Sequence, residues 1–158
     1  MASIIIMRGI SGSGKSTYIA KLRQNIKFPY VVTVVSMDHY FMQGEDYVFD
    51  VTKLGQAAAF CYKQYLIALA SAGPNDLIIV DNTNTTAVEI APYVLAAAAF
   101  DTPWCFVTLP VQEDLLRNTH GVPVESVQAQ IQRFNQPLPS FWAEDLEFKW
   151  WVQDQFAG

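Results

Sequence analysis

Positive charge is scarce in this sequence, since ten Lys and Arg stand against fifteen Asp and Glu, for a net charge of −5. A broad surface that follows nucleic-acid phosphates needs many cations, so this balance argues against tight non-specific binding to long nucleic acid. Cysteine is scarce too, and the separation of Cys61 from Cys105 predicts two reduced, buried thiols. With His39 and His120 these cysteines form no closely spaced ligand pair, so a zinc site is not predicted.

Long apolar runs are also missing, because none approaches the roughly 20 residues that a membrane-spanning helix requires. The early run Ile4-Ile5-Ile6 is too short for a signal peptide and has no basic segment ahead of it, so it is expected to be a first strand. We therefore expect a cytoplasmic protein without a membrane partner. With 158 residues, 51% of them apolar, the chain is predicted to form one domain, residues 1–158, with a substantial core.

Short β-branched runs alternate with helical patterns along the chain. Nearly continuous apolar runs are typical of strands covered on both faces, and they occur at residues 3–8, 31–35, 77–81 and 104–109. Apolar residues at three- and four-residue steps predict helices over 16–25, 53–72, 86–100 and 124–134. Pro92 should kink the third helix or delay its start. The alternation predicts an α/β domain with a doubly wound parallel sheet and flanking helices.

The stretch MRGISGSGKSTY, residues 7–18, holds the strongest motif. Gly9 to Ser16 match the GxxxxGK[ST] pattern of a P-loop, between a predicted strand and a predicted helix start. Glycines let backbone N–H groups point into one hollow, where they and the helix end hold triphosphate oxygens. Lys15 is predicted to reach the β- and γ-phosphates, and the Ser16 hydroxyl to bind Mg²⁺. The residues predicted to hold the nucleotide are Gly9, Ser11, Gly12, Ser13, Gly14, Lys15, Ser16 and Thr17.

Two aspartates follow predicted strands, whereas the DxxG and NKxD strings of a GTPase do not occur at the expected places. Asp81 ends the run LIIVD, the usual place for a carboxylate that assists the Mg²⁺ shell. Asp38 follows the second strand, at the sheet edge where open α/β folds bind ligands, and is our candidate general base for an attacking hydroxyl. The alternative for both is a turn-capping role. His39 ranks behind Asp38, because neighbours on an extended segment point to opposite sides.

Arg117, in the stretch LLRNTHGVP, is one of four arginines. Phosphoryl transfer gains from a cation that closes over the transferring group, because charge spreads over its equatorial oxygens. Arg117 is therefore the candidate lid cation, and the alternative is a surface arginine paired with Glu113 or Asp114.

The C-terminal segment, residues 137–158, is unusually aromatic. We expect it to pack on the core as a last helix or strand, and the alternative is a docking surface for a protein partner or a second copy. Its aromatic residues are Phe141, Trp142, Phe148, Trp150, Trp151 and Phe156.

Four stretches, GISGSGKS, SMDHYF, VDNTN and RNTHGVP, resemble in this order the polynucleotide 5′-hydroxyl kinase family of P-loop kinases. The likeness covers roughly residues 3–134 and includes phage polynucleotide kinases and AAA_33-like kinase domains, such as that of a ubiquitin-ligase-binding protein. It implies a P-loop NTPase fold with a small lid, in which the strand ending at Asp81 lies beside the P-loop strand. It also implies ATP as donor with Mg²⁺, Asp38 as general base and Arg117 on the lid.

The resemblance further implies a group of residues that contacts the acceptor. It also implies that one of them, Asp81, binds the metal. The residues implied at the acceptor are Asp81, Asn82, Asn84 and His120. Two departures stand out. The phage enzymes carry an arginine three residues after the catalytic aspartate, where this chain has Phe41, and a second lid arginine, where RNTHGVP offers only His120.

Three functions remain open at this point. The leading hypothesis is ATP-dependent phosphorylation of the 5′-hydroxyl end of a nucleic acid, gripped at a few terminal nucleotides because positive charge is scarce. The second is a small-molecule kinase on the same scaffold, acting on a nucleoside, sugar, antibiotic or nucleotide-sugar. The third is a non-catalytic nucleotide-binding or partner-binding module.

Overall fold

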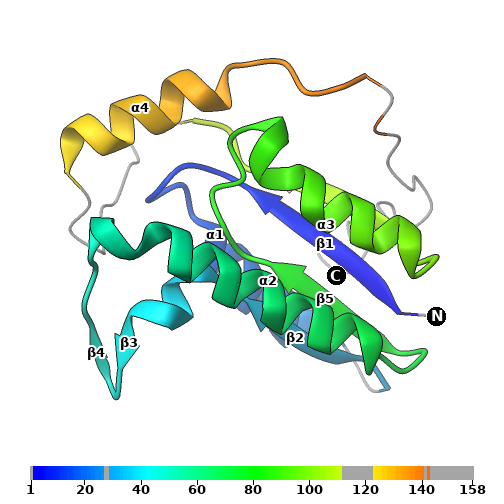
Figure 1. Ribbon diagram of the computed structural model, residues 1–158. Coiled ribbons are helices and arrows are strands. Elements are labelled where there is room, and N and C mark those ends of the chain that lie inside the picture. Colours follow the sequence, from blue (N-terminus) through cyan, green and yellow to red (C-terminus); the bar gives the residue numbers. More distant parts are fainter. Residues whose placement is uncertain (1, 27–28, 112–122, 141, 143–158) are drawn as a thin grey trace.

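The computed structural model describes residues 2–26, 29–111, 123–140 and 142. Four parallel strands form its main sheet, in the order β2-β5-β1-β6 (Figure 1). The strands are β1 (Ser3–Arg8), β2 (Val31–Val35), β5 (Asp76–Val80) and β6 (Trp104–Thr108). The first two have the bounds that the sequence predicts, β5 is shifted by one residue at both ends, and β6 ends one residue earlier than predicted.

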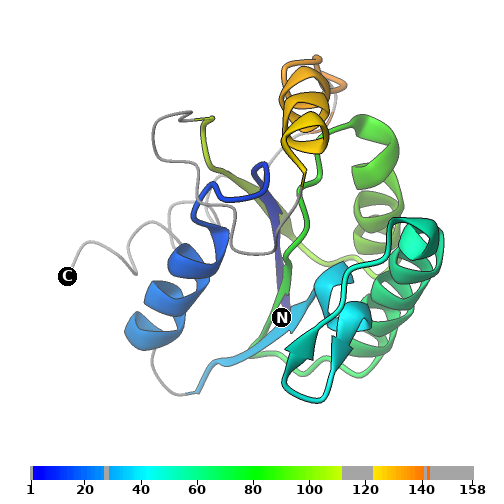
Figure 2. The same ribbon diagram turned by 90° about the vertical axis from the view of Figure 1, so that its left-hand side faces the viewer.

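Helices cover both faces of this sheet. Figure 2 shows α1 on one side and the pair α2 and α3 on the other, with α4 across the carboxyl ends of the strands. The helices are α1 (Lys15–Asn25), α2 (Leu54–Ala70), α3 (Ala87–Ala99) and α4 (Val124–Phe134). Parallel strands with helices on both faces confirm the predicted doubly wound α/β fold.

Successive residues of β1 point into two separate cores, because side chains of a strand alternate between its faces. Ile4 and Ile6 join the cluster under α2 and α3, whereas Ile5 and Met7 join Ile19 in the cluster under α1. All four β1 side chains are fully buried. The β-branched runs are thus nearly continuous because each face of the sheet has its own helical cover.

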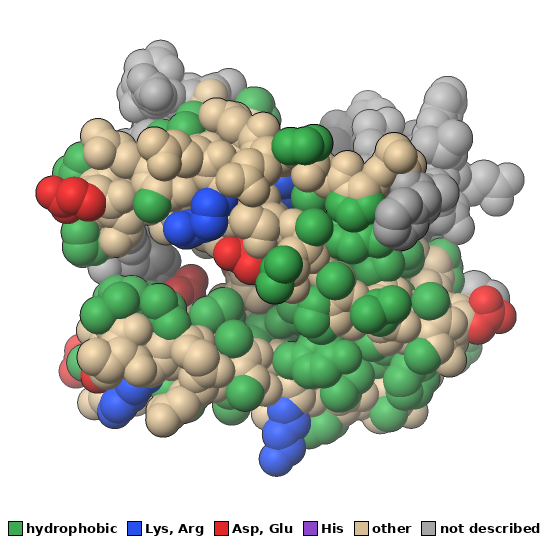
Figure 3. Space-filling model, turned by 45° about the horizontal axis from the view of Figure 1, so that its top comes forward, with side chains coloured by type: hydrophobic (Ala, Val, Ile, Leu, Met, Phe, Trp, Pro, Cys, Tyr) green, Lys and Arg blue, Asp and Glu red, His purple; other side chains and the backbone are tan. Residues whose placement is uncertain are grey.

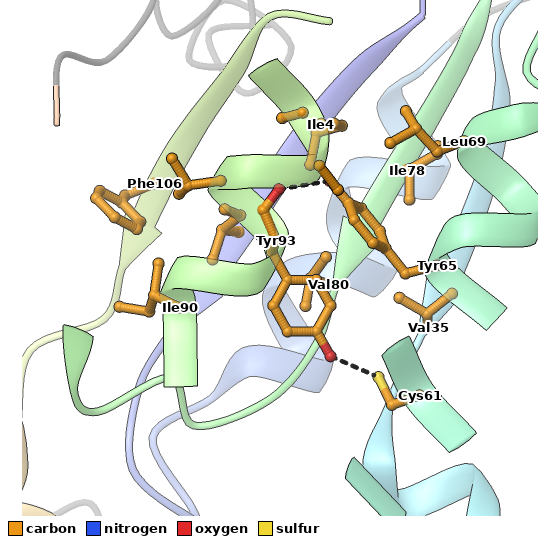
Figure 4. Close-up of a cluster of buried hydrophobic side chains, with 14 residues drawn as sticks. Ile4, Val35, Cys61, Tyr65, Leu69, Ile78, Val80, Ile90, Tyr93 and Phe106 are labelled. Carbon is orange, nitrogen blue, oxygen red and sulfur yellow. Dashed lines mark hydrogen bonds between the residues drawn. The ribbon is translucent and has the colours of Figure 1, made fainter. Parts of the chain in front are cut away.

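A chain of hydroxyl and thiol contacts crosses the core between α2 and α3 (Figure 4). The Tyr65 hydroxyl donates to the carbonyl of Tyr93 at 2.9 Å, and the Tyr93 hydroxyl donates to the Cys61 sulfur at 3.3 Å. Cys61 and Cys105 form no disulfide and are both buried, which confirms the expected state of the thiols. Burial raises the pKa of the Cys61 thiol, so the protonated form is favoured.

The helices predicted over residues 86–100 and 53–72 are both present, as α3 and α2. Helix α3 begins at Ala87 and runs through Pro92, so its start is not delayed. Thr86 caps it by accepting the Glu89 N–H, and Pro92 removes only the donor for the carbonyl of Val88, an exposed residue of the first turn where water can replace it. The helix expected over residues 53–72 is preceded by a 3₁₀ turn, η2 (Val51–Lys53).

The elements that follow β2 were not predicted from the sequence. A 3₁₀ helix, η1 (Met37–Phe41), leads into a two-stranded antiparallel hairpin of β3 (Met42–Gln43) and β4 (Asp46–Tyr47). Gly44, with a φ of 65°, allows the tight turn between the two strands. This segment packs against α2 and carries Asp38. In the described part of the chain, no helix has the length and apolar character needed to cross a bilayer.

Candidate functional site

The loop between β1 and α1 has the backbone shape of an anion cradle. Gly12 and Gly14 have φ values of 82° and 99°, which side-chain-bearing residues rarely adopt. A Cβ on Gly9 would run into the Ser13 hydroxyl, so this position also requires glycine. Gly14 begins α1 without a side-chain cap, so the first N–H groups of the helix are left for an anionic ligand. The backbone of this loop is therefore compatible with a phosphate cradle, and the nucleotide-binding roles of its residues stay predictions.

Lys15 lies folded back on this loop. Its Nζ donates to the carbonyl of Gly9 at 2.7 Å and to that of Ile10 at 3.1 Å. Burial lowers the pKa of Lys15, and the carboxylates of Asp81 and then Asp38 oppose that lowering. One ammonium therefore lies in the field of both predicted carboxylates, although these follow two different strands.

Asp38 is held on η1 by its backbone and by its carboxylate. The Ser36 hydroxyl accepts the Asp38 N–H at 3.1 Å, and the Tyr47 hydroxyl donates to Asp38 Oδ1 at 2.9 Å. The sequence argument against His39 assumed an extended segment, and this was wrong because both residues lie on a 3₁₀ helix. His39 is nevertheless exposed and lines a hollow between β2 and α2, together with Thr33 and Phe60.

The segment after β5 joins η1 to the P-loop strand. The Asp81 N–H donates to the Val35 carbonyl at 2.8 Å, which extends the pairing of β5 with β2 beyond the strand end. The Asn82 side chain accepts the Met37 N–H at 2.8 Å and donates to the Cys61 sulfur at 3.4 Å. Asn82 thus fixes the start of η1 against β5.

Asn84 lies beneath the P-loop rather than at its surface. Its side chain is 2% exposed and donates to the Met7 carbonyl at 2.7 Å, and its φ is 47°. The pairing of β5 with β1 is as the resemblance implied, so the strand before Asp81 lies beside the P-loop strand. Lys15, Asp38 and Asp81 therefore follow the carboxyl ends of three neighbouring strands, while the acceptor roles of Asn82 and Asn84 stay predictions.

Sequence reasoning missed Arg8, a buried arginine at the end of β1. Its Nε and Nη2 donate to the carbonyls of Asn84 at 2.9 Å and Thr85 at 3.3 Å. The guanidinium lies over the rings of Phe134, at 4.8 Å, and Phe106, at 5.8 Å. Burial lowers the pKa of Arg8. Arg8 links the P-loop strand to β6, to α4 and to the segment after β5.

Helix α4 reaches the P-loop through one face. The side-chain oxygen of Gln130 accepts the Ser11 N–H at 2.8 Å, and Arg133 Nε donates to the Thr85 hydroxyl at 3.4 Å. Residues 130, 133 and 134 share this face because they are three and four positions apart. A hollow separates α4 from the segment that begins α2 (Figure 3).

Several predicted residues lie outside the described part of the chain. They include Arg117 and His120, as well as the alternative partners Glu113 and Asp114. In the aromatic C-terminal segment, the Trp142 ring lies 6.4 Å from that of Phe106 at the edge of the core, and the other five aromatic residues named above are outside the described residues.

The donor set suits a magnesium ion that shares its shell with a nucleotide. Among the described residues, no group of three or more His, Cys, Asp or Glu is placed to hold a metal ion. Ser16 and Asp81 offer one hydroxyl and one carboxylate. Mg²⁺ usually keeps several waters and binds through one or two protein oxygens together with substrate phosphates, and the assignment of Ser16 and Asp81 to it stays a prediction.

The strand, glycine-rich loop and helix N-terminus define a P-loop α/β domain. A family model described as "AAA domain" (AAA_33) matches residues 4–137, and the chain belongs to this family. It is 32% identical over 140 residues to human NEDD4-binding protein 2, covering 83% of this chain but only 8% of that much longer protein. It is 30% identical over 135 residues to the uncharacterized protein PM0531 of Pasteurella multocida, covering 80% and 73% of the two chains.

Solved structures share the fold at low sequence identity. Chaetomium thermophilum Kti12 in complex with ADP-AlF3 has a TM-score of 0.64 at 14% identity, covering 98% of this chain and 97% of that one. Mycobacterium tuberculosis APS kinase CysC in complex with AMPPNP and APS has a TM-score of 0.60 at 16% identity, covering 99% and 98%. Both neighbours carry nucleotides, as expected of a nucleotide-binding fold.

Proposed function

We propose that this protein is an ATP-dependent kinase whose acceptor is the 5′-hydroxyl end of a polynucleotide. The observation that carries the proposal is that Lys15, Asp38 and Asp81 follow the carboxyl ends of three neighbouring parallel strands, β1, β2 and β5. A phosphate cradle, a cation and a carboxylate that faces it from a neighbouring element are the parts that phosphoryl transfer to a hydroxyl requires.

Each residue then has one task in the reaction. The amides of the P-loop hold the phosphates, and Lys15 exchanges the carbonyls of Gly9 and Ile10 for phosphate oxygens. Asp38 accepts the proton of the acceptor hydroxyl as its oxygen bonds to the γ-phosphorus and the bond to the β–γ bridging oxygen breaks, releasing ADP. Arg117 closes over the transferring group from the lid. Mg²⁺, held by Ser16 and Asp81, would neutralise charge on the phosphates.

Two features support a polynucleotide end as acceptor. The order of the four motifs is that of 5′-hydroxyl kinases, and the open edge beside η1 leaves Asp38 partly exposed. The net charge of −5 is compatible with binding at a chain end, where only a few phosphates are contacted. A small-molecule acceptor is the second candidate, favoured by the same scarcity of cations and by the structural likeness to APS kinase.

A panel of acceptors tests the proposal. The protein is incubated with γ-labelled ATP, Mg²⁺ and a 5′-hydroxyl oligonucleotide, the same oligonucleotide with a 5′-phosphate, nucleosides, sugars or antibiotics. We expect label on the 5′-hydroxyl oligonucleotide alone, and none with Asp38→Asn. Label on a small molecule instead would establish the second candidate. ATP binding without transfer to any acceptor would identify a non-catalytic module, whereas ATP hydrolysis alone decides nothing.

A further inference from the structure

The Tyr47 hydroxyl donates to Asp38 Oδ1 at 2.9 Å, across nine residues of chain. From this contact we infer that Tyr47 positions Asp38 for proton transfer. The inference rests on the proposed function, because it concerns the same general base. It assigns a task to the β3–β4 hairpin, which otherwise has none in the site.

The Tyr47 ring is fixed by its surroundings. Met42 pairs with Tyr47 across the hairpin, and the Val48 N–H donates to the Phe41 carbonyl at 2.9 Å. Phe41 is 4% exposed, and its ring centre lies 6.1 Å from that of Tyr47 and 5.2 Å from that of Phe49. The hydroxyl is therefore placed by backbone pairing and by a buried ring, and little side-chain freedom remains to be lost.

Two other contacts of η1 act on its backbone. Ser36 accepts the Asp38 N–H, and Asn82 accepts the Met37 N–H. These two bonds fix where η1 lies, but neither of them fixes the rotation of the Asp38 carboxyl group. A donor to Oδ1 fixes that rotation, and a carboxylate has enough lone pairs to accept a hydrogen bond from the acceptor hydroxyl as well.

Tyr47 is suited to remain a donor throughout the working range of the protein. Burial raises the pKa of its hydroxyl, and the hydrogen bond to the Asp38 carboxylate raises it further. A neutral donor also leaves the net charge near Lys15 and Asp81 unchanged, so Tyr47 orients the base without weakening the attraction between Lys15 and the carboxylates.

Tyr47→Phe removes the hydroxyl and keeps the ring. Tyr40→Phe is its matched control, because the Tyr40 hydroxyl lies on the same η1 but donates to Gln56 Oε1 at 2.6 Å. We expect Tyr47→Phe to lower kcat by about 10- to 100-fold, as for loss of a hydrogen bond to a charged group, with the KM for ATP unchanged. Tyr40→Phe should match the wild type. Equal kcat values for the two variants would overturn the inference.

A double-mutant cycle separates positioning from a merely structural role. In an Asp38→Ala background, Tyr47→Phe should slow the residual rate no further, whereas an undiminished effect there would contradict the inference. Urea unfolding of the wild type, Asp38→Ala, Tyr47→Phe and the double variant should show that the two changes in the free energy of unfolding are not additive. Additive changes would disprove the contact itself. A wild type that phosphorylates no acceptor defeats the proposed function, while an active wild type with a normal Tyr47→Phe defeats the positioning role alone.

Discussion

The side-chain oxygen of Gln130 accepts the backbone N–H of Ser11 at 2.8 Å, so α4 contacts the P-loop from 119 residues further along the chain. The amide of Ser11 belongs to the cradle that is predicted to hold the polyphosphate. In the present structure a side chain from α4 therefore satisfies a donor that the predicted site assigns to a nucleotide oxygen.

Removal of this contact should strengthen nucleotide binding. We expect Gln130→Ala to lower the Kd for ATP about 2- to 10-fold, because the Ser11 N–H no longer has to exchange one acceptor for another. Gln128→Ala, at an exposed position of the same helix, is the control and should leave the Kd unchanged. A weaker affinity in Gln130→Ala would show that Gln130 supports the nucleotide-bound loop rather than competing with it.

Binding of ATP should fall off at alkaline pH. Burial lowers the pKa of Lys15 below the ordinary 10.5, so its positive charge is lost as the pH rises through that lowered value. We expect the Kd for ATP to increase over this range in the wild type. Lys15→Arg keeps its charge and should show no such increase, as titration of binding by calorimetry would reveal. A parallel increase in both proteins would assign the effect to another group.

Arg8 should matter for stability rather than for chemistry. Arg8→Met leaves the carbonyls of Asn84 and Thr85 without their donors and removes the cation from the rings of Phe106 and Phe134. We expect a loss of about 3 kcal/mol in the free energy of unfolding, measured in urea. Arg23→Met, exposed in the last turn of α1, should change it by under about 0.5 kcal/mol. Equal losses would mean that Arg8 is not an anchor.

Affinity for oligonucleotides should depend little on their length. With a net charge of −5 the protein has few cations to follow a phosphate backbone, so binding at an end releases few counterions. We expect similar Kd values for 5′-hydroxyl oligonucleotides of about 4 and about 20 nucleotides, and a shallow dependence of log Kd on log salt. A steep slope for the longer one would instead indicate a long binding track.

Local patterns were enough to predict the sheet and the nucleotide loop. The bounds of β1 and β2 follow from unbroken β-branched runs. The P-loop at Gly9 to Ser16 is identified by the spacing of its glycines, lysine and serine. These signals are local because a buried strand or a phosphate cradle is built from consecutive residues.

Contacts between distant segments could not be predicted in this way. The strands of the β3–β4 hairpin have two residues each, too few to show the apolar–polar alternation of a strand. The hydrogen bond between Tyr47 and Asp38 therefore could not be predicted from the sequence pattern. The burial of Arg8 could not be predicted from its neighbours in sequence, because the rings that it contacts come from β6 and α4. Gly44, between Gln43 and Asp46, was a turn signal that could have revealed the hairpin.

The most direct test of the account is a structure with a non-hydrolysable ATP analogue, Mg²⁺ and a short 5′-hydroxyl oligonucleotide. The account predicts the polyphosphate on the Gly9–Ser16 loop and the acceptor oxygen within about 2.6–3.2 Å of the Asp38 carboxylate, in line with the γ-phosphate. An acceptor oxygen placed against any other base, or a polyphosphate bound away from this loop, would contradict it.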